Sequence, residues 1–82
     1  MDNIQINVQN ITTFKSTYKE IVHQLIKIRK ETNLTQQFLG DWLGVDRRKI
    51  MAFENLKIVD IEILLLYCDK FSIEINLTYK IN

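Results

Sequence analysis

Three consecutive cations, Arg47, Arg48 and Lys49, follow Asp46, a residue type that often caps the N-terminus of a helix. Cations at a helix N-terminus oppose the helix dipole, so a solvated helix start is a poor explanation for all three. An Arg side chain can donate two hydrogen bonds to guanine in the major groove, which contributes about 1–3 kcal/mol of base discrimination. These residues therefore indicate a helix that reads base edges with its first turn.

The residues around this cluster, Leu34 to Lys57, predict two short helices joined by a tight turn. Thr35 is suited to cap the first helix and Asp46 the second. Gly40 is small enough for a second helix to cross closely, and Gly44 suits the left-handed conformation that ends a helix. Two helices joined in this way, with basic side chains at the start of the second, are a device for entering the major groove.

This segment resembles the helix-turn-helix of the phage Cro/repressor (XRE-like) family. The matching positions are Leu34, Thr35, Gln36, Gly40, Leu43, Gly44, Val45, Ile50, Glu54 and Asn55. The resemblance extends upstream to Leu25 and downstream to Leu66, so it covers most of the chain. Leu56 departs from it, because the family usually has Gly there, and we expect Asn55 to take the left-handed conformation instead. Gly40 also departs, because Ala is commoner there and a helical Gly costs roughly 0.5–1 kcal/mol.

The resemblance implies a set of DNA-binding residues. They are Thr35, Gln36, Arg47, Arg48, Lys49, Ala52 and Lys57. Gln36 would contact a phosphate and brace the recognition helix, Lys57 would contact a phosphate beyond that helix, and Ala52 offers only a methyl group to thymine. The resemblance also implies a structural ion pair between Arg29 and Glu54, for which the planar guanidinium is well suited. A solvated Arg29 is the alternative.

The composition suits one small, mostly helical domain. The chain has 82 residues, 46% of them hydrophobic, with no Pro and two Gly. A monomer of this size buries only about 60–65% of its unfolded surface, which favours a dimer. The single Cys cannot form an internal disulfide, and no signal-peptide pattern or membrane-spanning run is visible, so we expect a cytoplasmic protein without membrane association. No pattern indicates a catalytic site, a metal site or a cofactor, so we do not expect an enzyme.

The net charge of +1 is unevenly distributed along the chain. Residues 1–57 hold nine Lys and Arg against six Asp and Glu, whereas residues 58–82 hold two against four. A basic front and an acidic back would let one face meet phosphates while the other meets a partner protein.

We expect a mostly α fold with a strand at the C-terminus. Within residues 1–15, the alternation at 2–8 predicts a short strand, with a frayed terminus as the alternative, and a connector follows. Residues 16–71 form the helical core. Its first helix would begin at a capping box of Thr17 and Glu20 and end near Glu31–Asn33, and its last helix would run from Asp60 to Lys70. The expected core stripe of the last helix is Ile61, Leu64, Leu65 and Cys68, with Ile63, Leu66 and Tyr67 as apolar surface on another side.

Residues 72–82 alternate without a slip between apolar and polar side chains, which is the strongest strand signal in the chain. A lone strand leaves an edge open, so we expect it to pair with the same strand of a second protomer. The alternative is pairing with residues 2–8 of its own protomer. The expected dimer interface comprises Leu66, Tyr67, Ile73, Ile75, Leu77, Tyr79 and Ile81. This arrangement is similar to that of antitoxins of the HipB type, which dimerise through such a strand.

Phe38 and Trp42 share one face of the first short helix, at positions that the family usually leaves polar. They either cover the first or last helix or form a surface for docking a partner protein. The favoured function is a dimeric, sequence-specific DNA-binding repressor that recognises an inverted repeat and acts as antitoxin and autoregulator of a HipBA-like operon, binding a toxin protein. The alternative is a protein-interaction module in which the helix-turn-helix is only scaffold.

Overall fold

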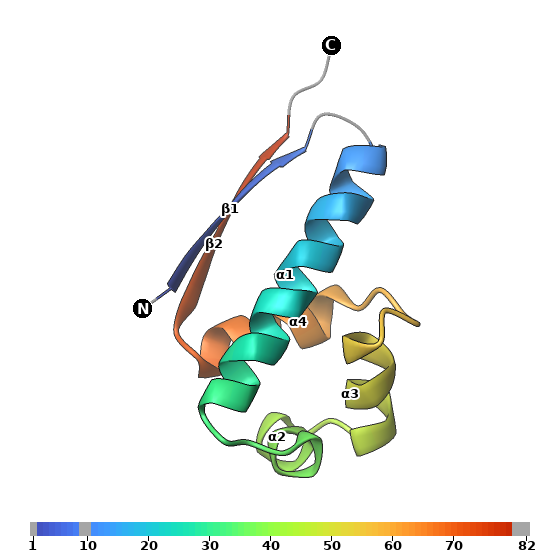
Figure 1. The fold of residues 1–82 in the computed structure, drawn as a ribbon, viewed down its shortest axis with the longest axis vertical. Coiled ribbons are helices and arrows are strands. Elements are labelled where there is room, and N and C mark those ends of the chain that lie inside the picture. The colour runs from blue at the N-terminus through green and yellow to red at the C-terminus, as the bar shows by residue number, and fades with distance from the viewer. Residues whose placement is uncertain (1, 9–10, 80–82) are drawn as a thin grey trace.

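The longest element is a helix that begins earlier than its capping box suggests. The computed structural model describes residues 2–8 and 11–79, and α1 spans Ile11–Glu31 (Figure 1). The predicted start near Thr17 is therefore wrong. Ile11 and Phe14 extend the helical apolar spacing of Tyr18 upstream of Thr17, and this spacing outweighs the local capping signal. The end of the helix at Glu31 is as predicted.

Three shorter helices follow α1: α2 spans Gln36–Leu43, α3 spans Arg47–Glu54 and α4 spans Ile61–Lys70. Each begins at a residue whose side-chain oxygen accepts a backbone N–H of the first turn, as predicted for Thr35, Asp46 and Asp60. Gly44 ends α2 with φ +72°, which confirms its left-handed conformation. These caps fix where the short helices begin and end.

The core lies where the four helices meet. Its largest fully buried side chains are Val22, Leu25, Leu39, Ile50, Phe53 and Tyr67. The predicted stripe of α4 is partly wrong, because Ile61 and Leu65 are half exposed while Ile63 and Tyr67 are buried with Leu64 and Cys68. Apolar residues surround so much of α4 that the spacing alone could not show which face is buried.

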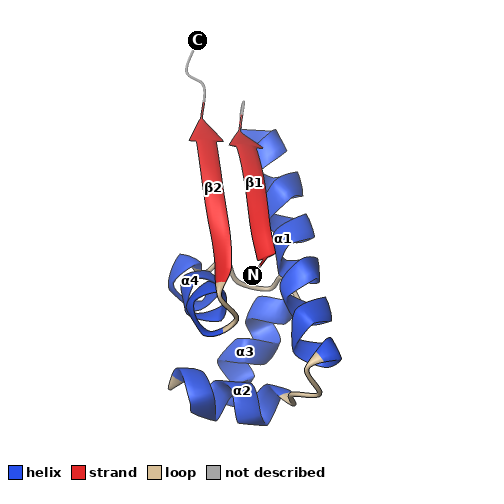
Figure 2. Ribbon diagram, turned by 90° about the vertical axis from the view of Figure 1, so that its left-hand side faces the viewer, coloured by secondary structure: helices blue, strands red, loops and turns tan. Residues whose placement is uncertain are grey.

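The strand β1 spans Asp2–Val8 and β2 spans Ile73–Tyr79, and the two pair in parallel, from Asp2 opposite Ile73 to Val8 opposite Tyr79. The strand prediction for residues 2–8 is confirmed, and pairing within the chain, given above as the alternative, is present. Parallel strands need a long crossover, which all four described helices supply. Figure 2 shows the strands side by side, with α1 packed against β1 and α4 against β2.

Two residues of the expected dimer interface belong to the core of this chain. Tyr67 is fully buried and Ile73 is 7% exposed, so assigning Tyr67 to an interface was wrong, and Ile73 packs inward in its own protomer. Leu66 and Ile75 are half-buried against the core. The side chains of Leu77 and Tyr79, and the whole of Ile81, lie outside the described residues. Among the described strands β2 pairs only with β1, so one edge of β2 faces no described strand.

Candidate nucleic-acid interface

The basic side chains at the start of α3 are exposed. Arg47, Arg48 and Lys49 all project from its first turn, and the side chain of Arg48 is 91% accessible to solvent. The Nε of Arg48 lies 3.3 Å from Oδ1 of Asp46, and Nζ of Lys49 lies 3.8 Å from Oδ2 of Asp60. Ion pairs this exposed contribute at most about 1 kcal/mol, so they yield readily to an anion from outside.

Asp46 places this turn by capping α3. Its Oδ1 accepts the backbone N–H of Arg48 at 2.8 Å, and this hydrogen bond, with a further one from the Arg48 side chain, lowers the pKa of Asp46. Ile50 and Phe53 face the core on the other side of the helix and are fully buried. The apolar face thus fixes the rotation of α3, and the cations are left on its outer face.

A tight connection sets the angle between α2 and α3. The backbone N–H of Val45 donates to the carbonyl oxygen of Gly40 at 2.8 Å. A Cβ at Gly40 would lie 2.6 Å from the carbonyl oxygen of Val45, which real Cβ atoms do not tolerate. Gly40 therefore permits the close approach, and Gly44 supplies the left-handed residue that reverses the chain.

Glu54, at the end of α3, holds the other elements together. The predicted ion pair is present: Nε of Arg29 lies 2.7 Å from Oε2 of Glu54, and Nη2 lies 2.9 Å from Oε1. Nη1 of Arg29 donates to the carbonyl oxygen of Leu34 at 2.7 Å. The hydroxyl of Tyr67 and the amide of Gln36 also donate to Glu54, at 2.6 and 3.0 Å. One carboxylate thus binds side chains from α1, α2 and α4.

We call these four side chains, Arg29, Gln36, Glu54 and Tyr67, the Glu54 network. Arg29 and Glu54 are 7% and 6% exposed, and no buried side-chain N or O atom among the described residues lacks a partner. Burial works to raise the pKa of Glu54, but the hydrogen bonds from Arg29, Tyr67 and Gln36 outweigh it and the pKa is lowered. Burial raises the pKa of Tyr67, and its bond to Glu54 raises it further. Glu54 is therefore a carboxylate that its neighbours hold ionised.

Tyr67 is the member of this network that sequence reasoning missed. A Tyr within an apolar helix stripe needs a partner for its hydroxyl when buried, and that requirement was the available signal. Gln36 braces α3 through Glu54, as expected, and its contact with a phosphate stays a prediction. The side chain of Gln36 is half-buried. The hydrogen bond from its amide nitrogen to Glu54 holds it in one orientation.

The other residues that the sequence predicts to bind DNA lie around the start and end of these helices. Thr35 is exposed and uses its hydroxyl oxygen to accept the backbone N–H of Phe38 at 3.0 Å. Ala52 is half-buried on α3, and Lys57 is exposed directly beyond it. Leu56 between them has φ +61° whereas Asn55 has φ −85°, so the expectation that Asn55 would adopt the left-handed conformation was wrong.

Phe38 and Trp42 on α2 partly fit both predictions, that they cover another helix and that they form a docking surface. Trp42 packs edge-on against Phe71, with ring centroids 5.9 Å apart, and Nζ of Lys70 lies 5.5 Å from the Trp42 centroid. Trp42 therefore covers the end of α4. Phe38 nevertheless stays 56% exposed and Trp42 43%, so a substantial aromatic surface remains uncovered by described residues.

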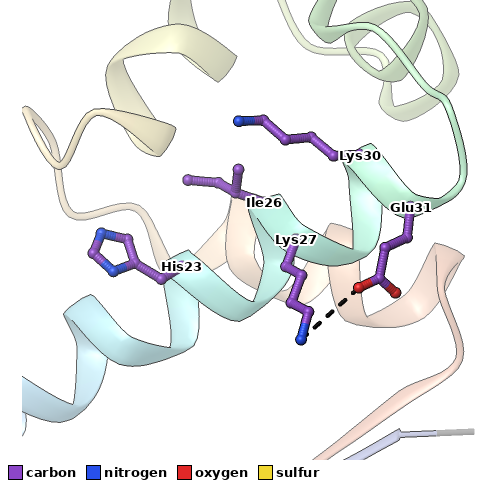
Figure 3. Close-up of a pocket in the computed structure, with 5 residues that line it drawn as sticks. All are labelled: His23, Ile26, Lys27, Lys30 and Glu31. Carbon is purple, nitrogen blue, oxygen red and sulfur yellow. Dashed lines mark ion pairs between the residues drawn. The ribbon is translucent and has the colours of Figure 1, made fainter.

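A shallow hollow of about 450 Å³ lies on α1, lined by His23, Ile26, Lys27, Lys30 and Glu31 (Figure 3). Lys27 and Lys30 point in different directions, and Nζ of Lys27 lies 3.9 Å from Oε1 of Glu31. All five lining side chains come from one helix, so no second element closes over a ligand. This surface is a solvated helix face.

Searches against protein-family models, curated proteins and solved structures found no match to this chain. The described part of the chain contains no group of three or more His, Cys, Asp or Glu that could hold a metal ion. None of the described helices combines the length and apolarity that crossing a bilayer requires.

Proposed function

We propose that this protein is a sequence-specific DNA-binding repressor that acts as a dimer. The observation that carries the proposal is the exposure of Arg47, Arg48 and Lys49 on the first turn of a helix whose opposite face is locked into the core. Cations at that end oppose the helix dipole, and the ion pairs of Arg48 and Lys49 with Asp46 and Asp60 are weak, so the DNA backbone and the acceptors of guanine can compete for these side chains.

In this proposal α2 and α3 act as a helix-turn-helix with α3 as the recognition helix. The first turn of α3 enters the major groove, while Thr35 and Gln36 at the start of α2 and Lys57 after α3 contact backbone phosphates. Arg48 would exchange its exposed contact with Asp46 for a base edge. The Glu54 network supports this geometry, since it ties Gln36 and both ends of the segment to one buried carboxylate.

Dimerisation through the edge of β2 that faces no described strand would bring two recognition helices together. A two-stranded sheet is marginal by itself, and an open edge is a template for another strand. A two-fold axis there would present two recognition helices to successive major grooves, roughly 34–36 Å apart, and the operator would be an inverted repeat. We further propose that the protein is cytoplasmic and acts as an antitoxin that binds a neighbouring toxin protein and represses its own operon.

The exposed faces of Phe38 and Trp42 favour a second candidate function. Exposed aromatic side chains often anchor protein interfaces, so the chain could be chiefly an interaction module in which α2 and α3 are scaffold. A protein of that kind would bind its partner with Arg47, Arg48 and Lys49 replaced by alanine.

Fluorescence anisotropy with a labelled duplex taken from upstream of its own gene separates these functions. We expect binding that exceeds binding to a scrambled duplex and that weakens by about 0.9 log units per log of salt for each phosphate neutralised. The variant Arg47→Ala/Arg48→Ala should lose this binding, whereas Lys70→Ala on α4 should keep it. Equal affinity for the two duplexes, or affinity independent of salt, would refute the DNA-binding function.

A further inference from the structure

A groove separates α1 from the connection between α3 and α4. It has a volume of about 280 Å³ and is lined by Lys15, Tyr18, Lys19, Leu56, Ile58 and Val59. Unlike the hollow on α1, this groove has walls from two segments far apart in the sequence, residues 15–19 and 56–59, which the fold brings together (Figure 1). None of the residues assigned to DNA binding lines it.

The side of the groove formed by the connection is apolar although it faces solvent. Val59 is 68% exposed and Leu56 36%, while Ile58 packs partly against the core and Tyr18 lies at the bottom, 5% exposed. The Tyr18 hydroxyl accepts the backbone N–H of Asp60 at 3.3 Å, which fixes the connection against α1. Two aliphatic side chains are therefore held at a defined distance from α1 without being covered.

Leu56 occupies a conformation that a leucine does not favour. Its φ of +61° brings Cβ close to the backbone, and a Gly would adopt the same conformation without this strain. At 36% exposure, the side chain of Leu56 gains less from burial than a fully buried core leucine. Backbone strain at a partly exposed side chain motivates a functional hypothesis for that side chain.

The α1 side of the groove is positively charged. Lys15 and Lys19 are exposed and one helical turn apart, so their like charges repel. None of the six lining residues is acidic. The nearby carboxylate of Asp60 caps α4 and lies beside Lys49, so it is directed elsewhere. A ligand that brings both an acidic group and a bulky apolar group would match the two sides of the groove.

We propose that this groove docks a short segment of a partner protein in which acidic side chains flank a bulky apolar side chain. The apolar side chain fills the space over Leu56 and Val59, and the carboxylates pair with Lys15 and Lys19. A nucleic-acid backbone would satisfy the lysines and leave the aliphatic wall uncovered. The groove is separate from the base-reading turn, so this inference does not depend on the proposed DNA-binding function.

Peptide selection on the full chain tests the inference, with a phage library of random short peptides as the probe. We expect enriched peptides with Asp or Glu beside Leu, Phe or Trp. Their affinity should fall at least about tenfold for Val59→Ser and for Lys15→Glu/Lys19→Glu, and stay unchanged for Lys30→Glu, an exposed lysine on the same helix. A peptide with Lys in place of its acids should bind the Lys15→Glu/Lys19→Glu variant. Failure to enrich any peptide, or enriched peptides that ignore these substitutions, would overturn the proposal.

The variant Leu56→Gly separates docking from a structural role. Glycine relieves the left-handed strain, so the midpoint of urea unfolding should rise while the affinity for the selected peptide falls. A variant that is more stable and still binds the peptide as tightly as the original chain would contradict the proposal. If Val59→Ser binds the upstream DNA as tightly as the original chain does, the groove acts independently of DNA binding. If neither protein binds that DNA, only the proposed repressor function is refuted.

Discussion

At the scale of single residues, Glu54 determines whether the α2–α3 segment keeps its shape. Its two oxygens accept hydrogen bonds from Arg29, Gln36 and Tyr67, and every one of these donors comes from a different helix. A buried ion pair is tolerated only where both charges are paired and hydrogen-bonded. Removal of one partner leaves the other charge buried and unpaired.

We therefore expect Glu54→Ala to lower the free energy of unfolding by about 3–5 kcal/mol, because Arg29 would be left uncompensated. Urea denaturation followed by circular dichroism measures this change. Glu62→Ala on the exposed face of α4 is the matched control and should stay within about 0.5 kcal/mol of the original chain. Similar effects for the two substitutions would contradict the role of Glu54. The loss in Arg29→Met/Glu54→Leu should be smaller than the sum of the single losses.

The same carboxylate predicts an acid dependence. The pKa of Glu54 is lowered in the folded state from its ordinary value of 4.5, so its stabilising effect is present above 4.5 and is lost as pH falls below it. The difference in unfolding free energy between the original chain and Glu54→Gln should be constant near neutrality and should shrink below this pH. A difference that stays the same across the acid range would show that Glu54 is not ionised in the native protein.

At the scale of elements, the α2–α3 connection depends on the absence of a side chain at Gly40. Alanine there should improve the helix propensity of α2 by roughly 0.5–1 kcal/mol. Its Cβ, however, would meet the carbonyl oxygen of Val45 at 2.6 Å, so backbone must move. We expect the cost of overpacking to exceed the gain in helix propensity, so that Gly40→Ala destabilises the protein by about 1–3 kcal/mol. Gln37→Ala, exposed on the same helix, serves as the control, and a rise in stability on Gly40→Ala would refute the close approach.

For the residue that follows the end of α3, we predict a gain in stability rather than a loss. Leu56 is left-handed without being a glycine, so Leu56→Gly should stabilise the protein by about 1 kcal/mol. Thermal unfolding measures this change, and Lys57→Gly, at a neighbouring exposed position, should not stabilise. A loss of stability on Leu56→Gly would mean that packing of the leucine side chain outweighs the backbone strain.

The elements that sequence reasoning predicted correctly are those with strong local signals. Thr35, Asp46, Asp60 and Gly44 begin and end helices because each satisfies or frees backbone groups within a few residues. The start of α1 was missed because the capping box at Thr17 competes with an apolar spacing that continues upstream. A local capping signal cannot decide between two helix starts when the apolar spacing fits both.

At the scale of the whole molecule, the features that could not be predicted from the sequence are contacts between distant segments. The buried face of α4, the burial of Tyr67 against Glu54 and the parallel pairing of β1 with β2 all depend on packing between remote parts of the chain. The Arg29–Glu54 pair was predictable only because a family resemblance supplied the partner. The exposure of Arg47, Arg48 and Lys49 follows from the apolar spacing of α3, and it could be predicted from sequence alone.

The molecule is elongated, with extents of 43 × 27 × 18 Å. The α2–α3 segment lies at one end of the long axis, and the C-terminal ends of the strands lie at the other (Figure 1). Contacts with a second protomer along β2 would therefore leave the start of α3 accessible to DNA. This separation is compatible with one chain that binds DNA at one end and proteins elsewhere.

Base discrimination by Arg48 tests the central claim most directly. Once footprinting has defined the bound site upstream of the gene, affinities for its single base-pair variants are compared between the original chain and Arg48→Ala. We predict that the original chain loses about 1–3 kcal/mol on substitution at a symmetry-related pair of positions, and that Arg48→Ala no longer distinguishes bases there. Uniform weakening on every sequence, or unchanged discrimination, would contradict a recognition helix that reads bases through its first turn.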